Sequence, residues 1–328
     1  MVMVSCSSLE KTEIKTQKAA KKPELQAPAK PTLDKNEQEN HSKYLEVLRK
    51  TKVVTPEDFC SRARAYSAVY EFELSLKDLN KAIELDPKYL RAYRAKGAIY
   101  RYLRQYEKSI EAFDKVIAID PKLVDAYVER GLTYGRLGDF QKQAEDCTKA
   151  ISLEPKNAWA YESRGWAYID LEQYEKSIED STKAIELMPA RRWAFNNRGL
   201  AYDYLGKREK AIEDYSAAIK IDPYQEKFYR NRADLYMRMD DSQNAIKDYG
   251  KLIEMNPNDS LCRMSRAMAY IKLEKNDLAL QDLDAVVKAR PNDGLGYMIR
   301  APLRAAKGDL KGFFDDMSKG ATLGSSNE

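Results

Sequence analysis

Residues 124–157 read VDAYVERGLTYGRLGDFQKQAEDCTKAISLEPKN, and the outline of this stretch recurs along most of the chain. Two apolar runs with helical spacing flank a short polar break at Leu137-Gly138-Asp139, and Pro155 follows the second run. Proline lacks an amide hydrogen and its ring clashes with the preceding turn, so it cannot continue a helix. The stretch therefore predicts a helix, a tight turn and a second helix.

The prolines give the period of the chain. They stand 34 residues apart, at Pro87, Pro121, Pro155, Pro189, Pro223, Pro257 and Pro291. Counted from them, seven copies begin at residues 56, 90, 124, 158, 192, 226 and 260. The aspartate before several of these prolines, as at Asp86, Asp120 and Asp222, is expected to cap the helix that follows.

Three columns of the copies carry a family resemblance. Position 8 is alanine or glycine and position 11 is tyrosine in all seven copies, and position 4 is aromatic in six, at Phe59, Tyr93, Tyr127, Tyr161, Phe195 and Tyr229. With the period of 34, these columns resemble the tetratricopeptide repeat family. The resemblance implies an all-α fold: an α-solenoid, coiled as a right-handed superhelix, of tandem helix-turn-helix repeats over residues 56–293.

The last 35 residues, 294–328, resemble a worn eighth copy. Tyr297 and Ala301 keep the pattern, but Pro302 lies inside the first helix and Arg304 stands where tyrosine is expected. We expect this copy to serve as the C-terminal cap of the array.

A pair of charged columns predicts a structural ion pair. Position 7 is basic in every copy, and position 23 is aspartate except at Ala112, which belongs to the copy that carries lysine, Lys96. A planar guanidinium binds a carboxylate through two hydrogen bonds and lysine cannot. We therefore expect Arg–Asp bridges between the two helices of a unit, and not a phosphate-binding ladder.

Composition narrows the function. Of 328 residues 33% are charged and 43% apolar, and no run approaches the roughly 18 apolar residues of a membrane span. Residues 1–54 hold eleven Lys or Arg against seven Asp or Glu, and the remainder is balanced at 45 against 45. A neutral array disfavours nucleic acid as a partner. The sequence predicts a large soluble solenoid without a transmembrane span.

The N-terminal region is expected to differ from the array. Residues 1–42 are rich in Ala, Lys, Pro, Gln, Glu and Ser, which predicts a disordered tether. Residues 43–55, with Tyr44 and Leu48, are expected to form a short capping helix. Thr55 before Pro56 then marks the start of the first repeat helix.

Cys6 raises a question of attachment. Met3-Val4-Ser5-Cys6-Ser7-Ser8 resembles a bacterial lipobox with Cys6 at the lipidated position, but the apolar leader of about 7 to 15 residues is missing before it. Either the true start lies upstream and Cys6 carries a lipid anchor, or Cys6 is a free cysteine of the tail. The corresponding locations are the cell envelope and the cytoplasm.

The remaining cysteines and the histidine predict no chemistry. Cys60, Cys147 and Cys262 fall in different repeats without paired spacing, so we expect buried small side chains and neither disulfides nor metal. The only histidine is His41, and no nucleotide-binding loop is present. The sequence predicts a protein that is not an enzyme and needs no cofactor.

The tryptophans indicate a binding surface. In the resembling family, positions 2, 5, 9, 12 and 13 face a concave groove, and Trp159, Trp166 and Trp193 all occupy such positions, with Tyr204 nearby. Exposed aromatic side chains are typical of interaction hot spots. The alternative is that these rings only pack against the neighbouring repeat.

Three asparagines beside the tryptophans suggest a second feature of the groove. Asn196, Asn197 and Asn231 resemble the peptide-backbone clamp of some family members, because a carboxamide both donates and accepts hydrogen bonds. The residues needed for the chaperone-tail carboxylate clamp are not present at the matching positions.

The two ends of the groove differ from its middle. Arg91 and Arg94, with Arg101, predict a basic N-terminal end, and the C-terminal end is apolar, with Leu261, Met264, Met268 and Ile271. The alternatives are that the arginines belong to an ordinary solvated helix face and that the methionines pack in the core against the eighth copy.

Two functional classes follow. The first is a non-enzymatic scaffold that binds a peptide or helical segment of another protein in the groove. The second is a non-catalytic targeting subunit of an enzyme or envelope complex, attached to the membrane if Cys6 is lipidated.

Overall fold

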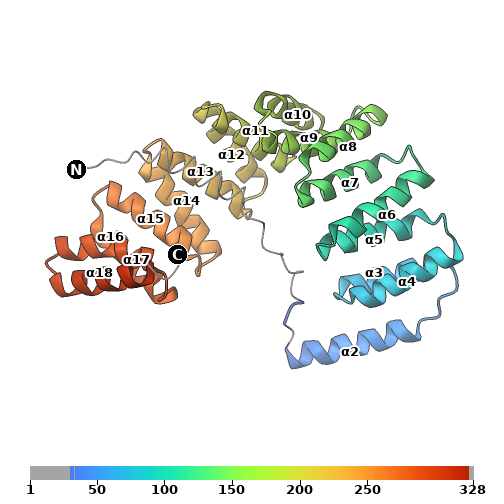
Figure 1. Cartoon of the computed structure of the whole chain (residues 1–328), viewed down its shortest axis with the longest axis horizontal. Coiled ribbons are helices and arrows are strands. Elements are labelled where there is room, and N and C mark those ends of the chain that lie inside the picture. The colour runs from blue at the N-terminus through green and yellow to red at the C-terminus, as the bar shows by residue number, and fades with distance from the viewer. Residues whose placement is uncertain (1–29, 33, 325–328) are drawn as a thin grey trace. The chain divides into compact units, whose positions relative to one another are not determined.

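The computed structural model describes residues 30–32 and 34–324, and all regular secondary structure in them is helical (Figure 1). The chain divides into two compact units, Met1–Asp139 and Phe140–Glu328. The division falls between the two helices of the third repeat, so each unit is treated on its own.

Unit 1 holds a leading helix, two complete repeats and the first helix of the third. Its helices are α2 (Lys35–Lys50), α3 (Pro56–Ala68), α4 (Phe72–Leu85), α5 (Leu90–Tyr102), α6 (Tyr106–Ile119) and α7 (Val124–Leu137). Within a repeat the two helices pack side by side, as α3 with α4 and α5 with α6, and each pair then packs on the next.

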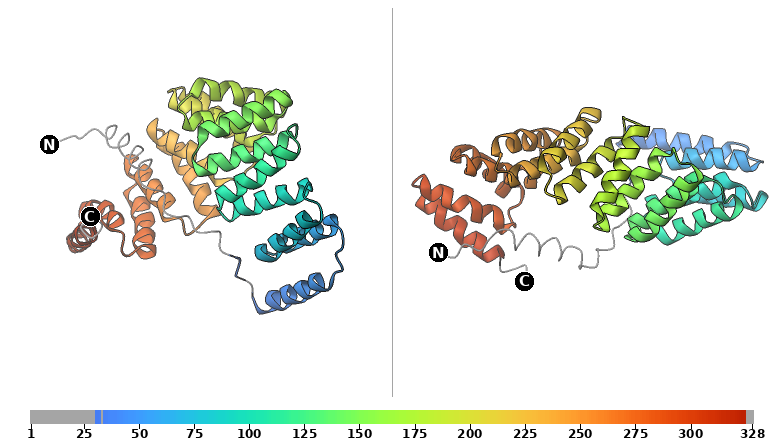
Figure 2. Two further views of the ribbon diagram at one scale, coloured as in Figure 1. Left: turned by 45° about the vertical axis from the view of Figure 1, so that its right-hand side comes forward. Right: turned by 90° about the horizontal axis from the view of Figure 1, so that it is seen from above.

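Unit 2 continues the same arrangement. Its helices are α8 (Phe140–Leu153), α9 (Ala158–Asp170), α10 (Tyr174–Leu187), α11 (Arg192–Tyr204), α12 (Arg208–Ile221), α13 (Glu226–Arg238), α14 (Ser242–Met255), α15 (Ser260–Lys272), α16 (Asn276–Ala289), α17 (Gly294–Ala306) and α18 (Leu310–Gly324). Figure 2 shows the paired helices side by side in both views. The predicted all-α, helix-turn-helix repeat fold is confirmed.

The prolines act as the sequence predicts, and the aspartates before them do not. Helices α4, α6 and α12 end two residues before Pro87, Pro121 and Pro223. Asp86, Asp120 and Asp222 each accept a hydrogen bond from the backbone N–H two residues later, inside the turn. The expectation that they cap the following helix was wrong, because that helix starts beyond the reach of so short a side chain.

The turn inside each repeat requires a left-handed residue. Position 15 has a positive φ in all eight copies, and three of them use glycine: Gly138, Gly206 and Gly308. In the third repeat, the N–H of Gly138 and the N–H of Asp139 both donate to the carbonyl of Tyr134, at 2.9 Å each. Such a closure turns the chain back at once, and in the repeats that lie within one unit the second helix lies against the first, as α12 does against α11.

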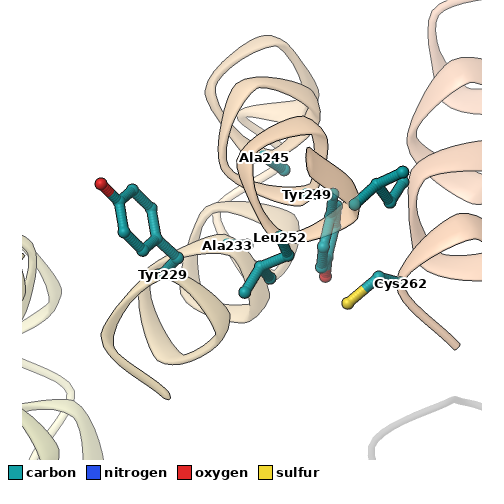
Figure 3. Packing of buried hydrophobic residues seen from close by; sticks show 7 residues of the cluster. Tyr229, Ala233, Ala245, Tyr249, Leu252 and Cys262 are labelled. Atoms are coloured by element: carbon teal, nitrogen blue, oxygen red, sulfur yellow. The ribbon is translucent and has the colours of Figure 1, made fainter. Parts of the chain in front are cut away.

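The small residue at position 8 makes room for a large one at position 24 of the same repeat. A Cβ added to Gly97 would stand 2.7 Å from the ring of Phe113, and one added to Gly199 would stand 2.9 Å from the ring of Tyr215. Figure 3 shows the packing of the sixth repeat, where Tyr249 extends from α14 toward Cys262 of α15. The close approach of the paired helices therefore depends on position 8.

The predicted arginine–aspartate bridges are present in both units. Each is a fork in which Nε and Nη2 of the arginine donate to the two carboxylate oxygens, at 2.6–2.9 Å. The pairs are Arg62–Asp78, Arg164–Asp180, Arg198–Asp214, Arg232–Asp248, Arg266–Asp282 and Arg300–Asp316.

The same arginines have a second contact that the sequence analysis did not foresee. In four of them Nη1 donates to a side chain of the preceding repeat: Arg164 to Thr148 at 3.0 Å, Arg198 to Thr182 at 3.1 Å, Arg232 to Ser216 at 2.7 Å and Arg300 to Asp284 at 2.6 Å. For Arg266 of the seventh repeat, the corresponding residue of the preceding repeat is Gly250, which has no side chain to accept the hydrogen bond. One residue thus holds a repeat together and also joins it to its neighbour.

The leading helix differs from the predicted one. It spans Lys35–Lys50 instead of 43–55, and Asp34 and Glu37 form a reciprocal capping box at its start. The predicted cap at Thr55 is present, because Thr55 and Asp58 form a second capping box before Pro56. Cys6 and most of the expected tether, residues 1–29, lie outside the described residues.

The arginine fork predicts a stability difference that charge alone does not. In Arg198→Lys the positive charge stays, but the ammonium group cannot replace the fork and the link to Thr182 together. We expect the free energy of unfolding in urea to fall by about 1–3 kcal/mol. Lys183→Ala, which removes only an exposed pair with Glu186, should change it by less than about 0.5 kcal/mol. Equal effects of the two substitutions would contradict the role of the fork.

Two glycines in helices should respond in opposite ways to alanine. Gly199→Ala places a methyl group against the Tyr215 ring and should lower stability by about 1–3 kcal/mol. The atom nearest to a Cβ at Gly250 is Arg266 Nη1, at 3.7 Å, so Gly250→Ala should raise stability by about 0.5–1 kcal/mol through helix propensity. Thermal and urea unfolding of both variants measure this; a stabilising Gly199→Ala would show that position 8 does not set the helix spacing.

Candidate functional site

The candidate site lies on the first helices of the fourth, fifth and sixth repeats, in unit 2. Helix α11 packs against α9 on one side and α13 on the other. We call the surface formed by positions 2, 5, 9, 12 and 13 of these three helices the central surface.

The three tryptophans are half-buried on α9 and α11. Trp159 and Trp166 are seven residues apart on α9, which places them on one face of that helix. The Trp193 ring meets the ring of Phe228 on α13 edge to face, with centroids 5.0 Å apart and planes at 71°. Trp193 therefore packs on the neighbouring repeat and still keeps part of its ring exposed.

Tyr204 supplies another accessible ring. Its side chain is 55% exposed at the end of α11 and stacks on Tyr174, with centroids 4.8 Å apart and planes at 14°. Stacking restrains the ring, so little side-chain entropy remains to be lost when a partner binds.

The three predicted asparagines make contacts between repeats. Asn196 is fully buried, and its Oδ1 accepts a hydrogen bond from Asn231 Nδ2 at 2.8 Å. Asn197 is buried and donates to the Glu162 carbonyl at 3.2 Å. In this arrangement they link α9, α11 and α13 instead of presenting free carboxamides. Asn196 Nδ2 has no hydrogen-bond partner.

Ion pairs surround these asparagines, and the sequence analysis missed them. Arg191 forks onto the buried Glu162 at 2.5 and 2.9 Å, Arg238 pairs with Asp203, and Arg230 binds Asp259 at 2.8 Å. The partners are 29 to 35 residues apart and belong to adjacent repeats or the loop between them. Opposite charges at spacings of 29 and 35 residues, close to the length of one repeat, were the signal that could have found them.

Asp259 has the clearest electrostatic perturbation of the group. Burial acts to raise its pKa, but hydrogen bonds from the backbone N–H of Cys262 and from the Arg230 guanidinium outweigh burial, and the pKa falls to about 2. The carboxylate also caps α15 by accepting the Cys262 N–H at 3.0 Å.

In unit 1 the predicted basic residues are paired with acids. Arg91 binds Glu57 at 2.7 Å and Arg94 binds Asp125 at 3.0 Å, and Arg101 pairs with Glu129. Each positive charge thus has a neighbouring carboxylate, which weakens the attraction of this surface for an acidic partner.

The predicted apolar end is split between core and surface. Met264 is buried and Ile271 packs into the core of α15, α16 and α17, whereas Leu261 and Met268 are about half exposed. Leu295 and Met298 on α17 are equally exposed and extend the apolar surface. The sequence analysis missed them because it did not carry positions 2 and 5 into the eighth copy.

Three further features of the described residues concern the cysteines, metal ligands and membrane spans. Cys60, Cys147 and Cys262 are buried and unpaired by disulfides, and burial raises the pKa of the Cys60 thiol to about 11. Residues 30–32 and 34–324 contain no cluster of His, Cys, Asp or Glu able to hold a metal ion. Within the same residues, none of the helices combines the length and apolar character of a membrane span.

Two surface pockets lie away from the tryptophans. One is lined by residues of α8, α9 and α10, including Thr148, Tyr168 and Lys176, and the other by residues near the turn between α17 and α18, including Arg304 and Asp309. Neither pocket contains a residue of the predicted groove.

Comparison with known families agrees with the repeat geometry. Models of the tetratricopeptide repeat match residues 97–138, 124–157, 147–179, 193–225 and 230–294. The chain belongs to the tetratricopeptide repeat family. The repeats support a protein-interaction scaffold, and the family fold is typically non-catalytic.

Solved structures share the fold at low identity. A tetratricopeptide repeat protein from Parabacteroides merdae is 18% identical with a TM-score of 0.56, over 76% of this chain and 98% of that one. PilW, a type IV pilus biogenesis factor, is 17% identical with a TM-score of 0.57, over 62% and 94%. The Cut9–Hcn1 assembly of the APC/C is 17% identical with a TM-score of 0.58, over 80% and 51%. No curated protein matches the chain.

The low pKa of Asp259 predicts a dependence of stability on acid. The carboxylate stabilises the folded state fully above its unfolded pKa of about 4, and this contribution disappears as the pH falls toward 2. Asp259→Ala should lower the free energy of unfolding by about 2 kcal/mol at pH 6 and by roughly half as much at pH 3. Urea unfolding at the two pH values measures it. Asp259→Asn keeps a capping side chain and should therefore lower the free energy of unfolding by less. A destabilisation by Asp259→Ala that does not change with pH would refute the ion pair with Arg230.

Proposed function

We propose that the protein is a scaffold that binds a peptide or a helical segment of another protein on the central surface, with Trp159, Trp166 and Trp193 as anchors. The observation that carries the proposal is that all three tryptophans of the chain lie on two adjacent first helices and stay partly exposed. Tryptophan is enriched among the residues that carry most of the binding energy in protein interfaces.

The contacts beneath the rings support a preformed surface. Phe228 holds Trp193 from α13, and the Arg191–Glu162 fork and the Asn231–Asn196 bond fix α9, α11 and α13 against one another. A surface whose side chains are already ordered loses less entropy on binding. Tyr204, stacked on Tyr174, adds an aromatic edge, and the paired Arg91 and Arg94 are secondary to this site.

A targeting role in a larger assembly is the second candidate. PilW is described as a biogenesis factor of type IV pili and Cut9–Hcn1 as a hetero-tetramer of the APC/C, and both share the fold. In this proposal, the catalytic activity resides in another chain, and lipidation of Cys6 would attach the protein to a membrane of the envelope. Mass spectrometry of the native N-terminus tests the lipid directly.

Tryptophan fluorescence tests the central surface, because every tryptophan of the chain belongs to it. Titration with an array of peptides should shift the emission for those that bind, and Trp166→Ala should weaken their affinity at least about tenfold, the effect of losing a hot-spot side chain. Binding of the same peptides to Trp166→Ala is followed by calorimetry, since the variant still contains two tryptophans.

Tyr224→Ala is the matched control. Tyr224 is the most exposed aromatic residue of the described chain, at 84%, and lies in the loop before α13. Its removal should leave peptide affinity unchanged. Partners that crosslink equally to the wild type, Trp159→Ala, Trp166→Ala and Trp193→Ala would place the binding site elsewhere and end the proposal.

A further inference from the structure

The turn of the first repeat contains an unusual residue. Position 15 has a left-handed backbone in every copy, and Tyr70 adopts it with φ 61°. The other seven copies have glycine or a charged residue there: Arg104, Gly138, Glu172, Gly206, Asp240, Glu274 and Gly308. Bulky side chains are uncommon in this region, so the ring of Tyr70 is held at a conformational cost.

Tyr70 belongs to an aromatic cluster in unit 1, which we call the turn cluster. Its ring lies 6.1 Å from that of Phe72, edge to face, and 6.4 Å from that of Tyr102, and the rings of Phe72 and Tyr102 are 5.0 Å apart. Tyr102 is among the exposed large side chains, and Tyr70 and Phe72 are half-buried. The cluster lies at the turn between α3 and α4 and at the end of α5, a site separate from the central surface.

A carboxylate adjoins the cluster in the chain. Glu71 stands between Tyr70 and Phe72 in the chain, and its Oε1 accepts from Lys30 Nζ at 3.1 Å and contacts His41 Nε2 at 3.3 Å. Lys30 is the first residue that the structure describes. It belongs to the sequence Pro28-Ala29-Lys30-Pro31, in which two prolines flank a basic residue.

These residues match a known type of recognition. A P-x-x-P segment forms a polyproline II helix that docks between aromatic rings, and a preformed helix loses little entropy on docking. Lys30, the basic residue of this segment, is paired with Glu71, which stands in the chain between two of the ring-bearing residues. The exposed Lys30–Glu71 pair alone would contribute little, so the rings must provide most of the affinity.

We propose that the turn cluster of Tyr70, Phe72 and Tyr102 is a docking site for the protein's own proline-rich segment, residues 22–31. The ion pair at Lys30 places the end of the segment at Glu71. A polyproline II helix rises about 3.1 Å per residue, so a segment in that form would bring Pro28 to about 6 Å along the chain from Lys30, a distance from which the rings could be reached. Docking fixes the path by which the N-terminal region leaves the array.

Hydrogen exchange of the full-length protein tests the proposal. The backbone amides of residues 24–27, 29 and 30 should exchange about tenfold more slowly in the wild type than in Tyr70→Gly. Glycine suits the left-handed turn at Gly138, Gly206 and Gly308, so this variant removes the ring and keeps the fold. Unchanged exchange in α3 to α6 verifies that the fold is intact. Glu172→Gly, at the same turn position in the fourth repeat, should leave the segment protected.

The other occupants are distinguished by the same measurement. Equal exchange of the segment in the wild type and Tyr70→Gly overturns the proposal. Protection that increases with protein concentration overturns it in favour of a second copy. A segment that exchanges freely, while an added peptide of residues 20–32 protects the turn between α3 and α4, overturns it in favour of a proline-rich partner.

Discussion

The position-7 guanidinium is the group on which the other contacts of a repeat depend. In the fourth repeat, Arg164 forks onto Asp180 of the second helix, donates to Thr148 of the preceding repeat, and lies 5.7 Å from the ring centroids of both Tyr161 and Tyr168. Its planar geometry fixes the directions of these contacts. One side chain therefore links the two helices of the repeat and joins the repeat to its neighbour, and the aromatic columns at positions 4 and 11 are explained as the rings that lie beside it.

Burial of this charge costs free energy. The cost limits how much the Arg–Asp forks of successive repeats, here called the ladder, add to the free energy of unfolding. Desolvation raises the pKa of Asp214 and of Asp180, and the hydrogen bonds from Arg198 and Arg164 do not fully offset it. A buried ion pair whose desolvation nearly cancels its attraction contributes mainly by excluding alternative arrangements. We infer that the ladder selects the register of each repeat, whereas apolar contacts such as Tyr215 against Gly199 provide most of the stabilisation. The ladder is weakest where Lys96 replaces arginine and where Gly250 offers no side chain.

The repeat period explains how much of the structure could be predicted from the sequence. Features repeated in most copies, such as the proline step, the small residue at position 8 and the Arg–Asp fork, could be predicted because several copies report the same constraint. The start of α2 could not be placed by period, since that helix occurs once, although Asp34 and Glu37 carry a capping-box pattern. The burial of the predicted groove asparagines could not be foreseen, for another reason. Position in a helix gives the face of Asn196, but its burial and pairing depend on neighbours such as Asn231, which the adjacent repeat supplies.

Specificity must then come from residues that the period leaves free. Position 2 of the successive first helices in unit 2 is Trp159, Trp193, Lys227, Leu261 and Leu295, so one backbone position presents aromatic, cationic and aliphatic groups in turn. The fold tolerates this variation because position 2 takes no part in the fork or in the packing of positions 8 and 24. Tyr70 follows the same logic at the turn: the backbone there needs only a left-handed residue, and glycine would meet that need at lower cost. An aromatic side chain at such a position is retained for what its ring contacts, which is why variation at structurally undemanding positions is the best guide to function in this chain.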